Sequence, residues 1–171
     1  MQSLLVLLSL STSSLLVQAA PFNVSHAADQ GLGGSSWWLT SCGSTLFAGS
    51  WIDIMEWEMC EAWCNDITVG SSGDAFQFAH IVDSDEMECV RTWMMKEIVT
   101  PNPCHYWLGG SRDEYGQYQW TSGHPMTYTD FVENPGNDLF IHLTPPNGYS
   151  WNTKNNQNDR NNGCLCRLDR D

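Results

Sequence analysis

The chain has few basic residues and little hydrophobic length, and both absences exclude classes of protein. Only seven Lys and Arg residues stand against twenty Asp and Glu residues, which leaves a net charge of -13. Because no basic patch is available to neutralise phosphates, nucleic acid is not expected as a partner. Beyond residue 20 no second hydrophobic segment follows, so we predict that the mature chain does not span a membrane.

The motifs of common enzymes and metal sites are also missing. Neither G-x-S-x-G nor a P-loop occurs, and the five histidines show no H-x-x-x-H pair or other metal spacing. Acidic pairs such as Asp83 and Asp85 are too local for glycosidase chemistry. His142 alternates with strand residues and is predicted to be a surface or interface residue rather than a ligand. We therefore expect no enzymatic activity.

The N-terminus has the pattern of a secretory signal. An apolar segment ends in small residues at Val17-Gln18-Ala19-Ala20, and we predict that residues 1–20 are cleaved and that the protein is secreted. Because no Lys or Arg precedes the apolar segment, a membrane anchor is the alternative. Residues 21–41 are predicted to be a flexible N-terminal arm, rich in Ala, Gly and Ser up to residue 36, after which Trp37 and Trp38 enter the folded part. The arm carries the single sequon, at Asn23, as a predicted glycosylation site. One domain then occupies 42–171.

The cysteine content fits an extracellular protein. Seven cysteines follow the predicted signal, and no paired C-x-x-C knuckles appear. Since the secretory route is oxidising, these features favour disulfides over metal thiolates. An odd number leaves one thiol unpaired or available to another chain, so a disulfide-linked homodimer is one predicted assembly.

Two helical patterns precede a strand-rich half, which indicates an α+β fold. The first helix is predicted over Ser50–Asp66, with Trp57, Cys60 and Cys64 on one face. Residues 76–81 alternate as a strand does and lead into the second helix. That helix starts with Asp83 and Glu86 in capping-box spacing, and its buried face comprises Met87, Val90, Met94 and Ile98.

Two hairpins are predicted in the second half. The first joins the aromatic stretches 106–110 and 119–120 through a charged turn containing glycine. The second joins 140–143 to 149–152 around Pro-Pro-Asn-Gly. If its turn pairs Thr144 with Tyr149, Asn152 lies opposite Ile141, and oxygen-bearing side chains gather at one end of the hairpin.

The first hairpin carries a family resemblance. Tyr106-Trp107-Leu108-Gly109-Gly110 and Trp120-Thr121-Ser122-Gly123-His124-Pro125 resemble the W-I-G-L and W-x-S/D-G-x-P signatures of the C-type lectin-like domain. The resemblance extends from about Ser50 to the C-terminus. It implies two helices with a small, mainly antiparallel sheet, a long loop region and stabilising disulfides. It also implies a secreted module that often binds sugar through calcium.

The same resemblance implies part of the disulfide map. In the family one bridge ties the first helix to the last strand, and Cys64 and Cys166 occupy those positions here, although Cys164 lies two residues away. The family's second bridge is absent, because its positions hold Phe140 and Asn156. We expect other cysteines to replace it.

Five cysteines are available for that replacement. Cys89, on the second helix, and Cys104, just ahead of the aromatic strand, could close a short loop, and we predict this bridge. Cys42 with Cys60, or Cys60 with Cys164, are alternatives that the sequence does not rank.

The calcium and sugar site of the family is only partly present. Sugar-binding members use E-P-N or Q-P-D, an acidic residue before the next strand, and Asn plus Asp from W-N-D. The resemblance therefore places sugar-binding residues and calcium ligands at Asn134, Asp138 and Asn152, with Thr153 a further metal position and Glu133 or Asn137 available by a loop shift. Gly136 replaces one ligand and Thr153 an aspartate. Because only one or two carboxylates are present, we predict that calcium binds with a dissociation constant of about 10⁻⁴ to 10⁻³ M or weaker, or does not bind.

Two functions follow as hypotheses. The first is a secreted carbohydrate-binding protein that recognises glycans on cells or microbes with weak or lost calcium dependence. Four aromatic side chains near the same loops could stack on sugar, namely Tyr128, Phe131, Tyr149 and Trp151. For Phe131 and Trp151, packing in the core is the favoured interpretation. The alternative is a lectin-like domain repurposed for a protein partner or an extracellular structural role.

Overall fold

The folded part begins inside the predicted arm. The structure, a computed structural model, describes residues 37–50, 55–69, 73–97, 105–145, 148–155 and 162–170. The predicted signal and the sequon at Asn23 lie outside these residues. Strand β1 (Trp37–Cys42) already pairs with its neighbour, and Trp38 is buried. The domain therefore starts earlier than the predicted residue 42, because this strand completes one edge of the sheet.

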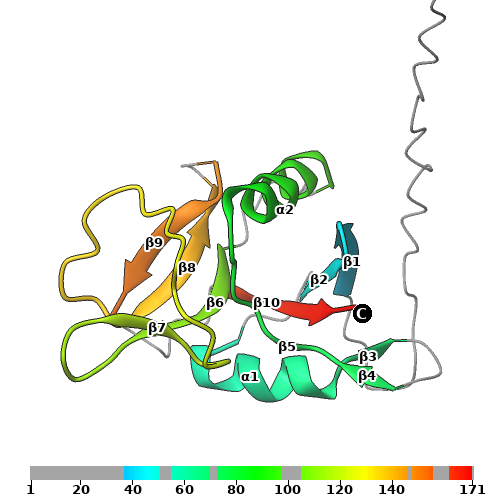
Figure 1. Ribbon diagram of the computed structural model, residues 1–171, viewed down its shortest axis with the longest axis horizontal. Coiled ribbons are helices and arrows are strands. Elements are labelled where there is room, and N and C mark those ends of the chain that lie inside the picture. The colour runs from blue at the N-terminus through cyan, green and yellow to red at the C-terminus, as the bar shows by residue number, and fades with distance from the viewer. Residues whose placement is uncertain are drawn as a thin grey trace, which may run out of the picture.

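One sheet joins both halves of the chain (Figure 1). Its order is β1-β2-β10-β6-β8-β9, with β5 also against β10 and β7 against β6. β10 is parallel to β6 and antiparallel to β2 and β5, so it links the N-terminal hairpin to the C-terminal strands. The strands are β2 (Thr45–Ser50), β5 (Gln77–Phe78), β6 (His105–Arg112), β7 (Tyr118–Trp120), β8 (Phe140–Thr144), β9 (Ser150–Lys154) and β10 (Asn162–Asp169). A separate ribbon pairs β3 (Thr68–Val69) with β4 (Asp74–Ala75).

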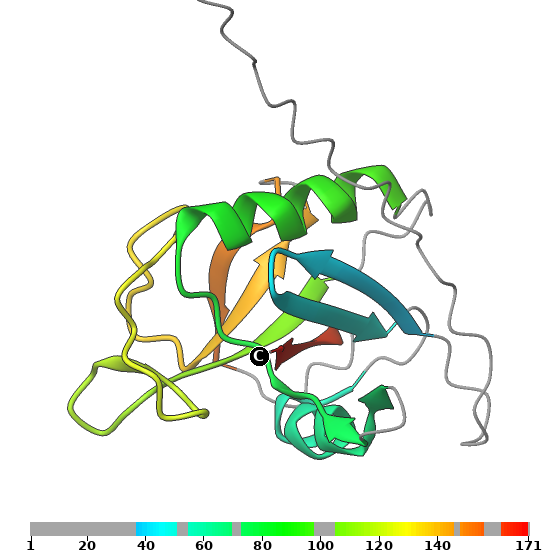
Figure 2. The ribbon, with the colours of Figure 1, turned by 45° about the vertical axis from the view of Figure 1, so that its right-hand side comes forward.

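Helix α2 (Ser84–Glu97) covers one face of the sheet (Figures 1 and 2). The predicted residues Met87, Val90 and Met94 are fully buried in a core that includes Trp38 and Trp151. The predicted capping box is confirmed in part, since Oδ1 of Asp83 accepts a hydrogen bond from the N–H of Glu86 at 2.9 Å. Residue Ile98 lies outside the described residues.

Helix α1 (Trp57–Asp66) covers the opposite face (Figure 1). Its buried cysteines contact a second core that includes Trp107 and Phe140. The indole N–H of Trp57 donates to the carbonyl of Leu108 at 2.8 Å. The helix begins later than the predicted Ser50, because that residue ends the fully buried strand β2. Two helices on a mixed sheet agree with the predicted α+β class.

Two neighbouring disulfides connect α1 to β10. Cys64 pairs with Cys166, as predicted, and Cys60 pairs with Cys164, which was an open alternative. Residues four apart on a helix share a face, as do residues two apart on a strand. The two elements therefore present matched pairs of sulfur atoms, with Cα–Cα distances of 5.4 and 5.5 Å.

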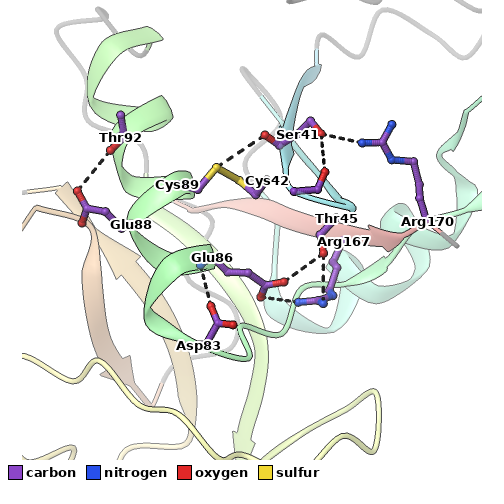
Figure 3. Close-up of a disulfide and its surroundings, with 11 residues drawn as sticks. Ser41, Cys42, Thr45, Asp83, Glu86, Glu88, Cys89, Thr92, Arg167 and Arg170 are labelled. Carbon is purple, nitrogen blue, oxygen red and sulfur yellow. Dashed lines mark hydrogen bonds and ion pairs between the residues drawn. A yellow bond between two sulfur atoms is a disulfide. The ribbon is translucent and has the colours of Figure 1, made fainter. Parts of the chain in front are cut away.

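The third disulfide corrects a prediction (Figure 3). Cys89 pairs with Cys42, and not with the predicted Cys104. The register of β1 places Cys42 at the turn between β1 and β2, under the N-terminal half of α2, and the Cα–Cα distance to Cys89 is 5.9 Å. Cys104, the seventh cysteine, lies outside the described residues, and the disulfide-linked homodimer stays a prediction.

A buried ion pair anchors the start of α2 to β10 (Figure 3). Nη1 of Arg167 lies 2.7 Å from Oε2 of Glu86, and the two side chains are only 6% and 12% exposed. The same guanidinium also contacts Asp169 at 2.7 Å. The hydroxyl of Thr45 donates to Glu86 at 3.1 Å, so three segments meet at this charge.

Within the described residues no helix is long and apolar enough to cross a membrane.

Candidate functional site

The candidate site lies on the loop that connects β7 to β8, residues 121–139 (Figure 1). Backbone contacts hold its middle against β9. The N–H of Trp151 donates to the carbonyl of Asp130 at 2.9 Å, and the N–H of Val132 donates to the carbonyl of Trp151 at 3.1 Å. The loop therefore has a defined position although it lacks regular structure.

Arg91 of α2 ties the same loop to the helix. Its guanidinium lies 2.7 Å from Oδ2 of Asp130 and donates to the carbonyl of Gly148 at 2.8 Å and to the hydroxyl of Ser150 at 3.3 Å. Because one planar group bonds these three acceptors as well as Glu88 of the same helix, it links α2, the loop and the start of β9.

Asp138 and Thr153 form the centre of the predicted site. The hydroxyl of Thr153 lies 3.2 Å from Oδ2 of Asp138 and 3.1 Å from the carbonyl of Pro135, and it can donate to one of them at a time. The hydroxyl of Tyr118 donates to the carbonyl of Asp138. Burial raises the pKa of Tyr118 above its ordinary value, so this hydroxyl remains a donor at neutral pH.

Arg112 organises the next part of the loop. Its Nη1 donates to Oδ1 of Asn137 at 2.9 Å, its Nε donates to the carbonyl of Gly116 at 2.9 Å, and its backbone N–H donates to Leu139 at 2.8 Å. The side chain therefore joins the turn after β6 to the residue beside Asp138. The positively charged guanidinium of Arg112 is thus bonded to Asn137, which was predicted to be available as a calcium ligand.

The two remaining predicted residues are exposed but bonded locally. Oδ1 of Asn134 accepts from the N–H of Gly136 at 3.3 Å, and Oδ1 of Asn152 accepts from the N–H of Thr153 at 2.8 Å. In the described part of the chain, no hydrogen bond joins Asn152 to Asn134 or Asp138. The structure thus brings Asp138 and Thr153 together, and leaves the two asparagines at its margin.

The register of the second hairpin differs from the prediction by one residue. Thr144 pairs with Ser150, so Asn152 lies opposite His142 and not opposite Ile141. The reason is that Tyr149 belongs to the turn, with a positive φ of 61°. The shift places Thr153, not Asn152, opposite Ile141.

These residues fit calcium poorly. The ion prefers six to eight oxygen ligands, several of them charged. Asp138 supplies one carboxylate and Glu133 is exposed, while Asp138 and the amides of Asn134, Asn137 and Asn152 already have hydrogen-bonding partners within the protein. Among the described residues, no three His, Cys, Asp or Glu side chains come together as metal ligands would.

The aromatic residues near the loop are mostly core residues. Trp151 is 0% exposed and Tyr149 is buried, so neither offers a free face. Tyr128 and Phe131 pack edge-on against Trp151, at ring distances of 5.7 and 5.3 Å. The exposed aromatic side chain is Tyr115, 81% exposed, in the turn after β6 that Arg112 joins to the loop.

Sequence reasoning missed Arg112, Tyr118 and Tyr115. Arg112 is one of only seven basic residues in an acidic chain and lies in the predicted charged turn, which is a signal for a specific partner. The sequence contains no comparable signal for Tyr118, because its acceptor is a backbone carbonyl twenty residues away.

Comparisons with known proteins agree on the fold. The sequence matches no protein-family model and no curated protein. The structure is similar to the C-type lectin CEL-I from Cucumaria echinata, with a TM-score of 0.62, 15% identity, and 76% of this chain and 94% of that chain covered. The Ca²⁺-independent C-type lectin SPL-2 from Saxidomus purpuratus gives 0.58, 19% identity, and 77% and 91% coverage. A calcium-independent type II antifreeze protein gives 0.55, 22% identity, and 77% and 91% coverage.

These similarities establish the fold of the protein. The chain has the C-type lectin-like fold, as its hairpin motifs implied. Structural similarity at sequence identities below 25% establishes only the fold, so the ligand must be inferred from the residues of the site.

Proposed function

We propose that this protein is a secreted carbohydrate-binding lectin-like protein whose sugar site works without calcium. The supporting observation is the Arg112 to Asn137 hydrogen bond, because a guanidinium joins the loop to strand β6 through an amide that the family resemblance made available as a calcium ligand. Asn134 on this loop and Asn152 on the neighbouring strand β9 present exposed amides. Amide groups both donate and accept, as recognition of sugar hydroxyls requires.

Tyr115 is the residue we assign to stacking on sugar. It is highly exposed, and its N–H is held by Oδ1 of Asp113 at 2.9 Å, so the turn that carries it is ordered. Aromatic faces supply apolar contact to the carbon side of a sugar ring. SPL-2, which has a similar fold, is described as a Ca²⁺-independent C-type lectin, and this supports the proposal of calcium independence here.

A glycan array tests this function with the secreted full chain. Binding is expected both in calcium and in a chelator, with no change in thermal midpoint between the two. Tyr115→Ala and Asn134→Ala should each weaken the binding. The matched control is Asn65→Ala, which removes an exposed asparagine from α1. Binding that vanishes in chelator would refute calcium independence, and loss in the control alone would refute this site.

A protein ligand is the second candidate, favoured by exposed apolar side chains. Val132 and Leu139, 44% and 41% exposed, lie on the loop, and Tyr115 lies on the adjoining turn. Aromatic and aliphatic exposure of this kind is typical of protein contacts. Saturable glycan binding with monosaccharide competition would reject this alternative as the main function.

A further inference from the structure

Two histidines far apart in the sequence meet on neighbouring strands. His105 lies on β6 and His142 on β8, and the pairing of Trp107 with His142 fixes their diagonal contact. Their Nδ1 atoms are 3.3 Å apart, and the rings are tilted by 35° with centroids 5.3 Å apart. His142 was predicted to be a surface or interface residue; it is only 2% exposed, so it is not on the surface, whereas His105 is partly exposed.

The spacing of these nitrogens suits a metal ion as well as a hydrogen bond. In a tetrahedral zinc site the Zn–N bonds are about 2.0–2.1 Å, so two ligand nitrogens stand about 3.3–3.4 Å apart. We propose that His105 and His142 together bind a divalent transition metal ion, with zinc as the reference ion. Imidazole also suits copper and nickel, whereas calcium prefers oxygen.

The surroundings offer support for a metal-bound water. Asn162 of β10 is paired in register with His105 and fully buried, and its Nδ2 has no hydrogen-bond partner. An amide N–H in this position is a donor suited to a water or hydroxide on the metal. The hydroxyl of Thr144 lies 3.4 Å from Nδ1 of His142 and provides a further oxygen at the site.

The affinity should be moderate. In the described residues, no carboxylate or third His or Cys joins the pair, so water or neutral oxygen must complete the coordination. The nearby ammonium of Lys154 lies 3.3 Å from Oδ1 of Asn162 and opposes a second cation. In the metal-free pair, one ring donates through a proton on Nδ1. For both Nδ1 atoms to bind the metal, this proton must move to Nε2 of the same ring, which changes the tautomer without net proton loss.

Calorimetric titration of zinc into the chelator-stripped full chain tests the site. We expect one zinc ion per chain, no calcium binding at the same site, and an increase in thermal midpoint with zinc. His105→Gln keeps a hydrogen-bonding amide but removes the metal ligand, and should weaken zinc binding by roughly tenfold or more. His124→Gln, which alters an exposed histidine outside this pair, is the matched control.

Two further measurements separate the pair from other causes. Cys104 directly precedes His105, so Cys104→Ser tests whether a thiol binds the zinc instead. Should His105→Gln fail to fold, zinc must still shift the ring signals of His105 and His142 in the NMR spectrum of the wild-type chain. No zinc binding at millimolar concentration, binding unaffected by His105→Gln, or loss through Cys104→Ser alone would each overturn the proposal.

Discussion

Arg112 donates a hydrogen bond from Nη1 to Oδ1 of Asn137 at 2.9 Å, and it thereby places a fixed positive charge on the long loop. The neighbouring carboxylate, Asp138, is bonded to the hydroxyl of Thr153. Carboxylates gathered at one site repel one another unless a cation neutralises them. Here the predicted calcium ligands are mostly amides, and the guanidinium of Arg112 is hydrogen-bonded to one of them, Asn137.

Replacing Arg112 should loosen the loop without disturbing the rest of the fold. Arg112→Gln loses hydrogen bonds to Asn137 and Gly116, which should lower the free energy of unfolding by about 1–2 kcal/mol. Amide hydrogen exchange at 136–139 should accelerate. The matched control is Arg170→Gln, whose exposed side chain contacts Ser41 and Ser44 instead. Unchanged exchange in the Arg112 variant would contradict the anchoring role.

The buried ion pair at the start of α2 should be far more sensitive than an exposed one on the same helix. Glu86→Gln removes one of the carboxylates that neutralise the buried guanidinium of Arg167. It should therefore lower the free energy of unfolding by about 3 kcal/mol. Glu88→Gln removes an exposed partner of Arg91 and should cost less than about 0.5 kcal/mol. Urea unfolding at neutral pH measures both. Equal losses would show that burial does not govern this pair.

His80 should make stability depend on pH. It is buried against His124, and burial, with the charge of Arg167 and then His124, lowers its pKa from 6.5 to about 4. The unfolded chain therefore binds a proton that the folded chain does not between these values. Stability is complete above pH 6.5 and falls as the pH drops toward 4, by at most roughly 3 kcal/mol.

His80→Phe checks this dependence, because it removes the titrating group and fits a site where neither ring nitrogen has a partner. Urea unfolding at neutral pH and near pH 4.5 should show a smaller loss in the variant than in the wild type. Parallel losses in the two proteins would mean that other groups, such as the paired carboxylates, dominate acid unfolding.

The disulfides should contribute unequally. Cys42–Cys89 closes a separation of 47 residues, worth about 4 kcal/mol in the chain-entropy description. Cys60–Cys164 closes only a small ring once Cys64–Cys166 has formed, worth about 2.5 kcal/mol. Alanine pairs at 42 and 89 should therefore lower the thermal midpoint more than alanine pairs at 60 and 164. The reverse order would show that native packing outweighs the unfolded-state effect.

The local patterns in the sequence were sufficient for the fold class and its main elements. The Trp107 and Trp120 motifs, the capping-box spacing at Asp83 and the helical spacing of Cys60 and Cys64 each depend on residues close together in the chain. Such short-range patterns carry their own physical cause, because helix and strand periodicity decide which side chains share a face. The Cys64–Cys166 pairing came from the family resemblance.

Contacts between distant segments were decided only by the tertiary structure. The partner of Cys89, the register that sets Asn152 opposite His142, and the meeting of His105 with His142 all depend on how strands and helices are placed against one another. The one-residue shift came from Tyr149 entering the turn in a left-handed conformation, which composition does not reveal. The sequence by itself determined which side chains are available for binding; the packing of β6, β8 and β10 decided which of them meet.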